Sequence, residues 1–104
     1  MSEVSDKTLL EQQLDGSRVL IERRRMAKRL QANFDFRKLI LEGFCLEDAA
    51  RYVQESCDPS MTPENRADAL AMAQASGHLL RFLAVTEQMG AYSERTESDL
   101  VAAI

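Results

Sequence analysis

The feature that most restricts the fold is a long segment that starts at Pro63 and contains no further proline. The hydroxyl of Thr62 can cap a helix start, and proline suits the first helical position. Apolar residues then recur at helical spacing until Gly90, a residue type that commonly ends helices. The sequence therefore predicts one long helix from Pro63 to about Met89.

This predicted helix carries two apolar stripes, whereas a helix that covers a core with one side needs only one. We therefore expect the helix to be central, or one of its faces to meet another subunit. The first stripe comprises Ala71, Ala75, His78, Phe82, Val85 and Met89, and the second comprises Ala69, Met72, Ala73, Ser76, Leu79, Leu80 and Leu83.

A first helix is expected from Asp6, a suitable cap, to about Gln31. Gly16 weakens it by about 1 kcal/mol relative to alanine, and a break there would leave residues 1–15 as an N-terminal arm. One predicted face holds Val19, Arg23, Met26 and Leu30, with Leu10 and Leu14 on a neighbouring stripe.

Two short helices are expected between these long ones. Asn33 or Asp35 would cap the first of them, and Gly43 would end it at a tight corner. The second would cover residues 45–56 and end before Asp58. These elements predict an all-α fold, a small bundle of four to five helices around one long central helix, with residues 16–90 as the helical domain and 91–104 as a tail that can extend the long helix.

No motif for catalysis or metal binding is present. Cys45 and Cys57 lack the spacing of a zinc site, and the sole histidine, His78, lies on an apolar stripe typical of packed or interface residues. No apolar run approaches the roughly 20 residues that span a bilayer. We expect no catalytic residue, metal, cofactor or membrane contact, and two reduced, partly buried cysteines in an intracellular protein that is not an enzyme.

Charge is unevenly distributed along the chain. The net charge is −4, yet eight basic and two acidic residues give the segment 18–38 a charge of +6. The basic residues Arg23, Arg24, Arg25, Lys28 and Arg29 are close together in this segment. They can dock on an acidic protein surface or on the acidic half of this chain, track phosphates, or be solvated. The acidic composition and the lack of interleaved aromatics favour a protein contact over nucleic acid.

Three motifs resemble a group of small helical proteins of tailed bacteriophages. They are NFDFRKLILEGF at 33–44, EDAARYV at 47–53 and DPSM at 58–61, followed by QMG at 88–90. The group shows an xDFxKLIxxGF, EEAxRLV and ADPxM pattern before a long helix that ends in QMG. The resemblance covers about residues 33–90, and Gly77-His78 and the apolar tail end depart from it. It implies a place among virion and head-assembly genes, with no activity attached and no site residue to carry over.

The sequence thus favours a phage structural or assembly protein that acts in several copies through contacts with virion proteins or its own copies, in the virion or the host cytoplasm. The alternative is a small intracellular phage effector that binds a host protein, a nucleotide signal or nucleic acid. The predicted electrostatic contacts are the five basic residues above, and the predicted apolar contacts are Met72, Leu79, Leu80, Phe82 and Leu83.

Overall fold

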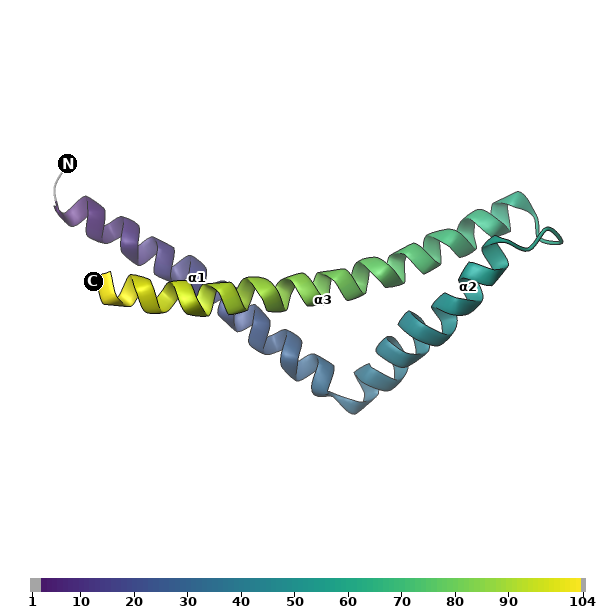
Figure 1. The fold of residues 1–104 in the computed structure, drawn as a ribbon, viewed down its shortest axis with the longest axis horizontal. Coiled ribbons are helices and arrows are strands. Elements are labelled where there is room, and N and C mark those ends of the chain that lie inside the picture. Colours follow the sequence, from purple (N-terminus) through teal and green to yellow (C-terminus); the bar gives the residue numbers. More distant parts are fainter. Residues whose placement is uncertain (1–2, 104) are drawn as a thin grey trace. The chain divides into compact units, whose positions relative to one another are not determined.

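The structure, a computed structural model, describes residues 3–103 and contains helices but no strand in that range (Figure 1). Its elements are α1 (Glu3–Ala32), the π-helix η1 (Phe36–Asp48), α2 (Ala49–Ser56) and α3 (Pro63–Ala103). Because η1 and α2 adjoin, the described chain has three helical segments, of which α3 is the longest. The all-α prediction is confirmed, but the expected count of four to five helices is wrong.

Three glycines expected to interrupt helices lie inside them. Gly16 is within α1, Gly43 within η1 and Gly90 within α3, and no described glycine has a positive φ. The predicted break at Gly16 and the predicted helix ends at Gly43 and Gly90 are therefore wrong. Residues 3–15 share a helix with those that follow, and the tail extends α3 to Ala103.

Side-chain caps start two of the helical segments. The Asn33 Oδ1 atom accepts the backbone N–H of Phe36 at 2.9 Å, and the Thr62 hydroxyl accepts that of Asn65 at 3.1 Å. Each bond satisfies an N–H that has no partner within its own helix. The predicted caps at Asn33 and Thr62 are confirmed.

The π-helix η1 has wider turns than an α-helix, because each N–H bonds a carbonyl five residues back. At its end, the N–H of Ala49 bonds the carbonyl of Phe44. A Cβ atom at Gly43 would lie 3.1 Å from the carbonyl oxygen of Lys38, also five residues back. Glycine at this position leaves room for that carbonyl, so Gly43 accommodates the wide turn and does not end the helix.

The chain divides into two compact units. The terminal unit holds α1 up to Arg29 together with α3 from Ala84, and the hairpin unit holds Leu30–Leu83. In the hairpin unit, η1 and α2 lead into the turn before Pro63, and α3 begins after it (Figure 1). The turn is held by Asp58, whose carboxylate accepts the N–H and the hydroxyl of Ser60 at 2.9 and 2.7 Å.

Few apolar side chains are buried. Five described hydrophobic residues form the core, none of them a large side chain that is fully enclosed, whereas sixteen large hydrophobic residues are exposed. Buried hydrophobic side chains supply most of the free energy that stabilises a fold. The described chain therefore leaves much of its apolar surface in contact with solvent. The five core residues are Leu14, Ile21, Ala27, Ala69 and Leu83.

Candidate protein-contact surfaces

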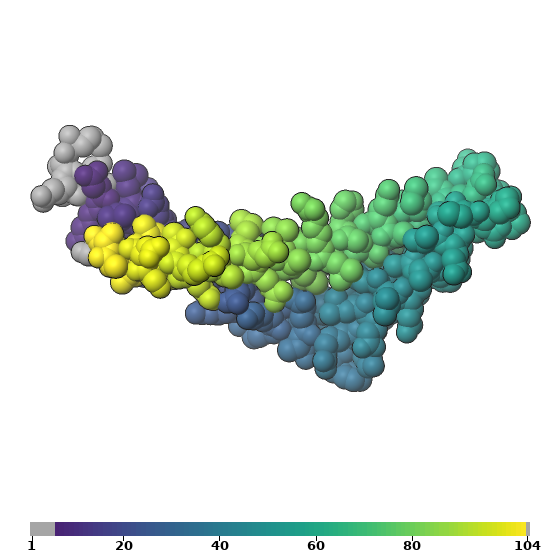
Figure 2. Space-filling view, in the orientation of Figure 1, coloured from purple at the N-terminus to yellow at the C-terminus, as the bar shows by residue number. Residues whose placement is uncertain are grey.

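The two helices of the terminal unit lie against each other, the first coloured purple to blue and the second yellow-green to yellow in Figure 2. Small residues make the contact between them. The buried Ser17 hydroxyl donates a hydrogen bond to the carbonyl of Ser93 at 2.9 Å, across 76 positions of sequence. A Cβ atom at Gly90 would lie 2.9 Å from the carbonyl oxygen of Leu20 and would overlap the side chain of Arg24. Later residues of α1 thus face earlier residues of α3, so the helices run antiparallel, and they approach each other closely at Gly90.

Arg24, one of the five predicted docking residues, is used within this unit. Its Nη1 lies 2.7 Å from Glu94 Oε1, with the Arg24 side chain only 22% exposed. Its buried Nε has no hydrogen-bond partner among the described residues. Arg18 also faces the acidic tail, 3.6 Å from Glu97. Arg18 and Arg24 are thus paired with acidic residues of the same unit.

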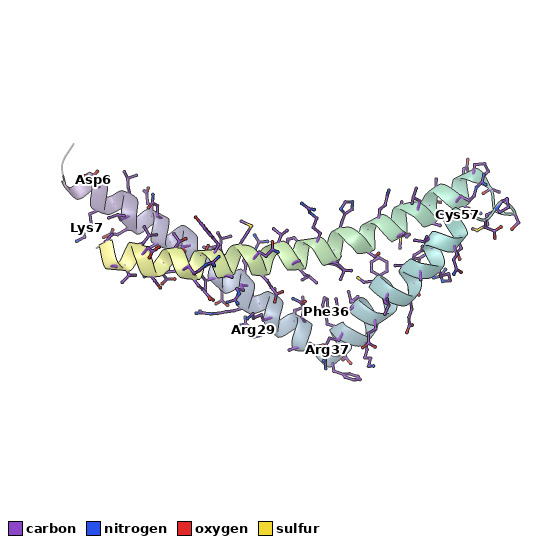
Figure 3. The ribbon with its side chains drawn as sticks, viewed as in Figure 1. Asp6, Lys7, Arg29, Phe36, Arg37 and Cys57 are labelled. Carbon is purple, nitrogen blue, oxygen red and sulfur yellow. The ribbon has the colours of Figure 1, made fainter. Side chains whose placement is uncertain are left out.

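The other predicted docking residues stay on the surface of α1. Arg25 and Arg29 lie 3.7 and 3.3 Å from Glu22, and both side chains are more than 60% exposed. Arg29 extends from α1 in Figure 3. Arg23 and Lys28 are also exposed. Because exposed pairs contribute about 0–1 kcal/mol, the pairing with Glu22 leaves Arg25 and Arg29 able to bind a partner.

One face of the terminal unit is charged. It contains an open hollow between the two helices, with Arg25 on one side and Glu94 and Glu97 on the other. Ile21, Ser98 and Val101 complete the lining. Opposite charges line this hollow, so it presents both signs to solvent.

Another face of the terminal unit is apolar. A hollow there is lined by Leu20 of α1 and by Gln88, Met89, Tyr92 and Ser93 of α3. Tyr92 is 65% exposed and Met89 is 46% exposed. Val85 lies one turn before Met89 and is also exposed, which continues the apolar row at helical spacing. We call Leu20, Val85, Met89 and Tyr92 the apolar face of the terminal unit.

The predicted apolar contacts in the hairpin unit divide into two groups. Met72, Leu80 and Phe82 are 41%, 43% and 53% exposed, so they can meet a partner. Leu79 is half-buried, and Leu83 is 5% exposed and belongs to the core. The second predicted stripe is thus the one that is partly covered, because Ala69, Ser76 and Leu83 are its buried members.

The groups that could carry chemistry are separate from one another. Cys45 and Cys57 are free thiols, the first half-buried with its Sγ 3.9 Å from the carbonyl of Ser76, the second exposed. Burial raises the pKa of the Cys45 thiol. His78 is exposed on α3. Within residues 3–103 no group of three metal-ligating side chains comes together.

Sequence reasoning missed the small residues of the helix contact. Ser17, Gly90 and Ser93 are buried, although none is a large apolar residue. A usable signal was the seven-residue recurrence in α3 of Ala69, Ser76, Leu83 and Gly90, all of which are buried. Seven-residue spacing is typical of a helix that packs along another helix.

Among the described residues, no helix has the length and apolar character needed to cross a bilayer. Comparison with protein-family models, with curated proteins and with solved structures found no match to this chain.

Proposed function

We propose that this chain is a structural or assembly protein of a tailed phage, which acts in several copies by contacts with other virion subunits. The observation that carries the proposal is the excess of exposed over buried apolar residues: among the described residues, sixteen large hydrophobic side chains are exposed and three, Leu14, Ile21 and Leu83, are buried. Exposed apolar patches on a folded protein are typical of surfaces that bind other proteins. The phage setting comes from the motif resemblance over residues 33–90.

The proposed apolar contacts in the hairpin unit are Met72 and Leu80 on one stripe of α3, with Leu79 at the margin, and Phe82 on the other stripe. Leu83 is left out because it is buried. The exposed cations of α1 add an electrostatic contact that orients an acidic partner. This role needs neither a catalytic group nor a cofactor, and it places the protein in the virion or, during assembly, in the host cytoplasm.

The test is Leu80→Asp in the gene of the phage that encodes the chain. A carboxylate at a buried contact is costly to desolvate, so we expect a large loss of particle yield. Gln74→Asp, an equally charged change at an exposed polar position of α3, is the control and should leave the yield unchanged. Circular dichroism of both purified variants checks that the helices are retained. Normal particle yield with a folded Leu80→Asp protein would exclude this contact.

The exposed cations also support a second candidate function, a phage effector that binds nucleic acid in the host. Arg25, Lys28 and Arg29 lie within about one turn on α1, and exposed cations can follow phosphates. The two candidates differ in salt dependence. Binding to duplex DNA that weakens steeply with salt and disappears on replacing these three residues with glutamine would favour the effector.

A further inference from the structure

One side of α1 in the terminal unit combines exposed apolar residues with cations. Val19 and Met26 are both exposed and lie seven positions apart, about two helical turns, so they share one side of the helix. The buried residues Leu14, Ser17 and Ile21 lie on the opposite side of α1. The side that carries Val19 and Met26 is therefore the one left uncovered within this unit.

Arginines lie at both edges of this uncovered side. Arg23 stands between Val19 and Met26 in the sequence and lines the small hollow next to the apolar face of the terminal unit. Arg25 lies at the other edge, where it lines the charged hollow, and Arg29 follows it by one turn. We call this surface the outer face of α1, and it comprises Val19, Arg23, Arg25, Met26 and Arg29.

We propose that the outer face of α1 binds an acidic helix of another protein, one that carries an apolar stripe with carboxylates on both sides of it. Val19 and Met26 would pack on the stripe, because seven-residue spacing is the repeat by which one helix packs along another. The arginines at the two edges would pair with the flanking carboxylates. The inference rests on the proposed function, for which it states the chemistry of one partner.

Charge complementarity favours this partner over a second copy of the chain. Glu22 is the one acidic residue between positions 19 and 29, so three arginines leave the outer face basic. A copy that presented the same face would bring basic edges against basic edges, and like charges in a contact are strongly unfavourable. An acidic helix would instead meet cations at both of its edges.

The acidic side chains that the structure pairs within the hairpin unit match this face less well. Glu42 lies 3.0 Å from Lys38, and Arg51 lies 3.7 Å from Asp48 and 3.0 Å from Glu55. Each of these carboxylates thus has a cation of the same unit beside it. The surfaces around them present both signs of charge, whereas the outer face of α1 calls for an acidic one.

Nucleic acid and an anionic membrane also fit this face less well. Phosphates laid along it would meet the apolar side chains of Val19 and Met26, and the Glu22 carboxylate would repel them. Residues 19–29 contain no aromatic side chain of the kind that anchors helices at a lipid interface.

The experiment titrates the full chain into a fluorescent synthetic peptide and follows its anisotropy. The peptide is a helix of about three heptads with leucine along one stripe and glutamate on both sides of it. We expect binding that weakens as salt is added. Two matched peptides, one with lysine for glutamate and one with serine for leucine, should each bind at least about tenfold more weakly. These controls leave the protein unchanged, so they stay decisive even if a protein variant unfolds.

Protein variants locate the binding site. Arg25→Glu should raise the Kd for the glutamate peptide about tenfold, whereas Arg95→Glu, the same change at an exposed position of α3, should leave it unchanged. Met26→Ala should also weaken binding, and Val101→Ala is its control because Val101 is exposed on α3. Circular dichroism checks that all four variants keep their helices.

Several results would overturn the inference. They are no binding of the glutamate peptide, equal binding of either control peptide, and tighter binding of duplex DNA or of phosphatidylglycerol vesicles. A wild-type chain that light scattering shows to be a dimer, and that Met26→Ala makes a monomer, would also overturn it in favour of a second copy.

Phage particles separate this inference from the proposed function. An Arg25→Glu chain that no longer binds the peptide but enters particles at the wild-type copy number would overturn the inference and leave the proposed function standing. A wild-type chain that binds the peptide as expected but never enters particles would support the acidic partner and contradict the structural role.

Discussion

Replacing Gly90 with alanine should destabilise the protein, although alanine is the better helix former. Gly90 lies inside α3, where α1 approaches closely. An added Cβ would overlap Arg24, lie 2.8 Å from the Arg24 Cδ and lie 2.9 Å from the carbonyl oxygen of Leu20. The nearest of these atoms is the Arg24 Cβ, which is fixed to the backbone just as the Leu20 carbonyl is, so the two helices would have to move apart.

Two opposing terms set the size of the effect. Alanine gains about 1 kcal/mol over glycine in a helix interior. Inserting an atom into a close-packed contact costs about 1–3 kcal/mol, and a backbone clash lies at the upper end. Separation of the helices would also weaken the Ser17–Ser93 hydrogen bond and the Arg24–Glu94 ion pair. We expect a net loss of about 1–2 kcal/mol in the free energy of unfolding.

Gly16→Ala and Gly77→Ala are the matched controls, since a Cβ at either position meets nothing within 4 Å. Each should gain up to about 1 kcal/mol, which corresponds to a rise in Tm of about 4–8 °C for a small domain. Thermal unfolding followed by circular dichroism compares the three variants. If Gly90→Ala stabilises the protein as much as Gly16→Ala does, the close helix contact is refuted.

Three further predictions concern the hairpin unit. Thr62→Ala removes the hydroxyl that accepts the Asn65 N–H, so it should lower the free energy of unfolding by about 1 kcal/mol. Urea unfolding measures this loss, and an unchanged midpoint would exclude the cap. Iodoacetamide should modify the exposed Cys57 faster than Cys45 at pH 8, because burial raises the Cys45 pKa and lowers its thiolate fraction; equal rates by mass spectrometry would contradict this. Hydrogen bonds from Ser60 lower the pKa of Asp58, so their stabilising effect is present above the ordinary carboxyl pKa and is lost as pH falls through the lowered value. Ser60→Ala removes the hydroxyl bond and should move the Asp58 pKa upward in an NMR titration; an unmoved pKa would show that this hydroxyl bond is not a cause of the lowered value.

The helical class and two helix starts could be predicted from the sequence because they depend on local chemistry. Asn33 and Thr62 cap the helices that follow them, and each side chain accepts a hydrogen bond from the backbone N–H three residues later. The glycines were poor indicators of helix ends. A glycine inside a helix can instead make room for another segment of the chain that packs closely against that helix. Gly90 does so at Leu20, a contact 70 positions away in sequence that no local pattern contains.

The periodicity of large apolar residues identified faces but not which of them is covered. On α1 it selected Val19 and Met26, which are exposed, whereas the buried row is Leu14, Ser17 and Ile21. A search for apolar residues overlooks a buried row that contains serine. A serine can nevertheless be buried when its hydroxyl has a hydrogen-bond partner, as that of Ser17 has in the Ser93 carbonyl. The opposite charges of the two chain regions allowed docking on an acidic partner or on the acidic half of the chain, and only the structure pairs Arg24 with Glu94.

The central claim, that this chain works as a structural part of a phage particle, is tested most directly by quantitative mass spectrometry of purified particles. We predict that the protein is present at a fixed copy number relative to the capsid protein, greater than one per particle and matching the symmetry of the shell, portal or tail. A protein that is expressed during infection but absent from both mature particles and assembly intermediates would contradict the account.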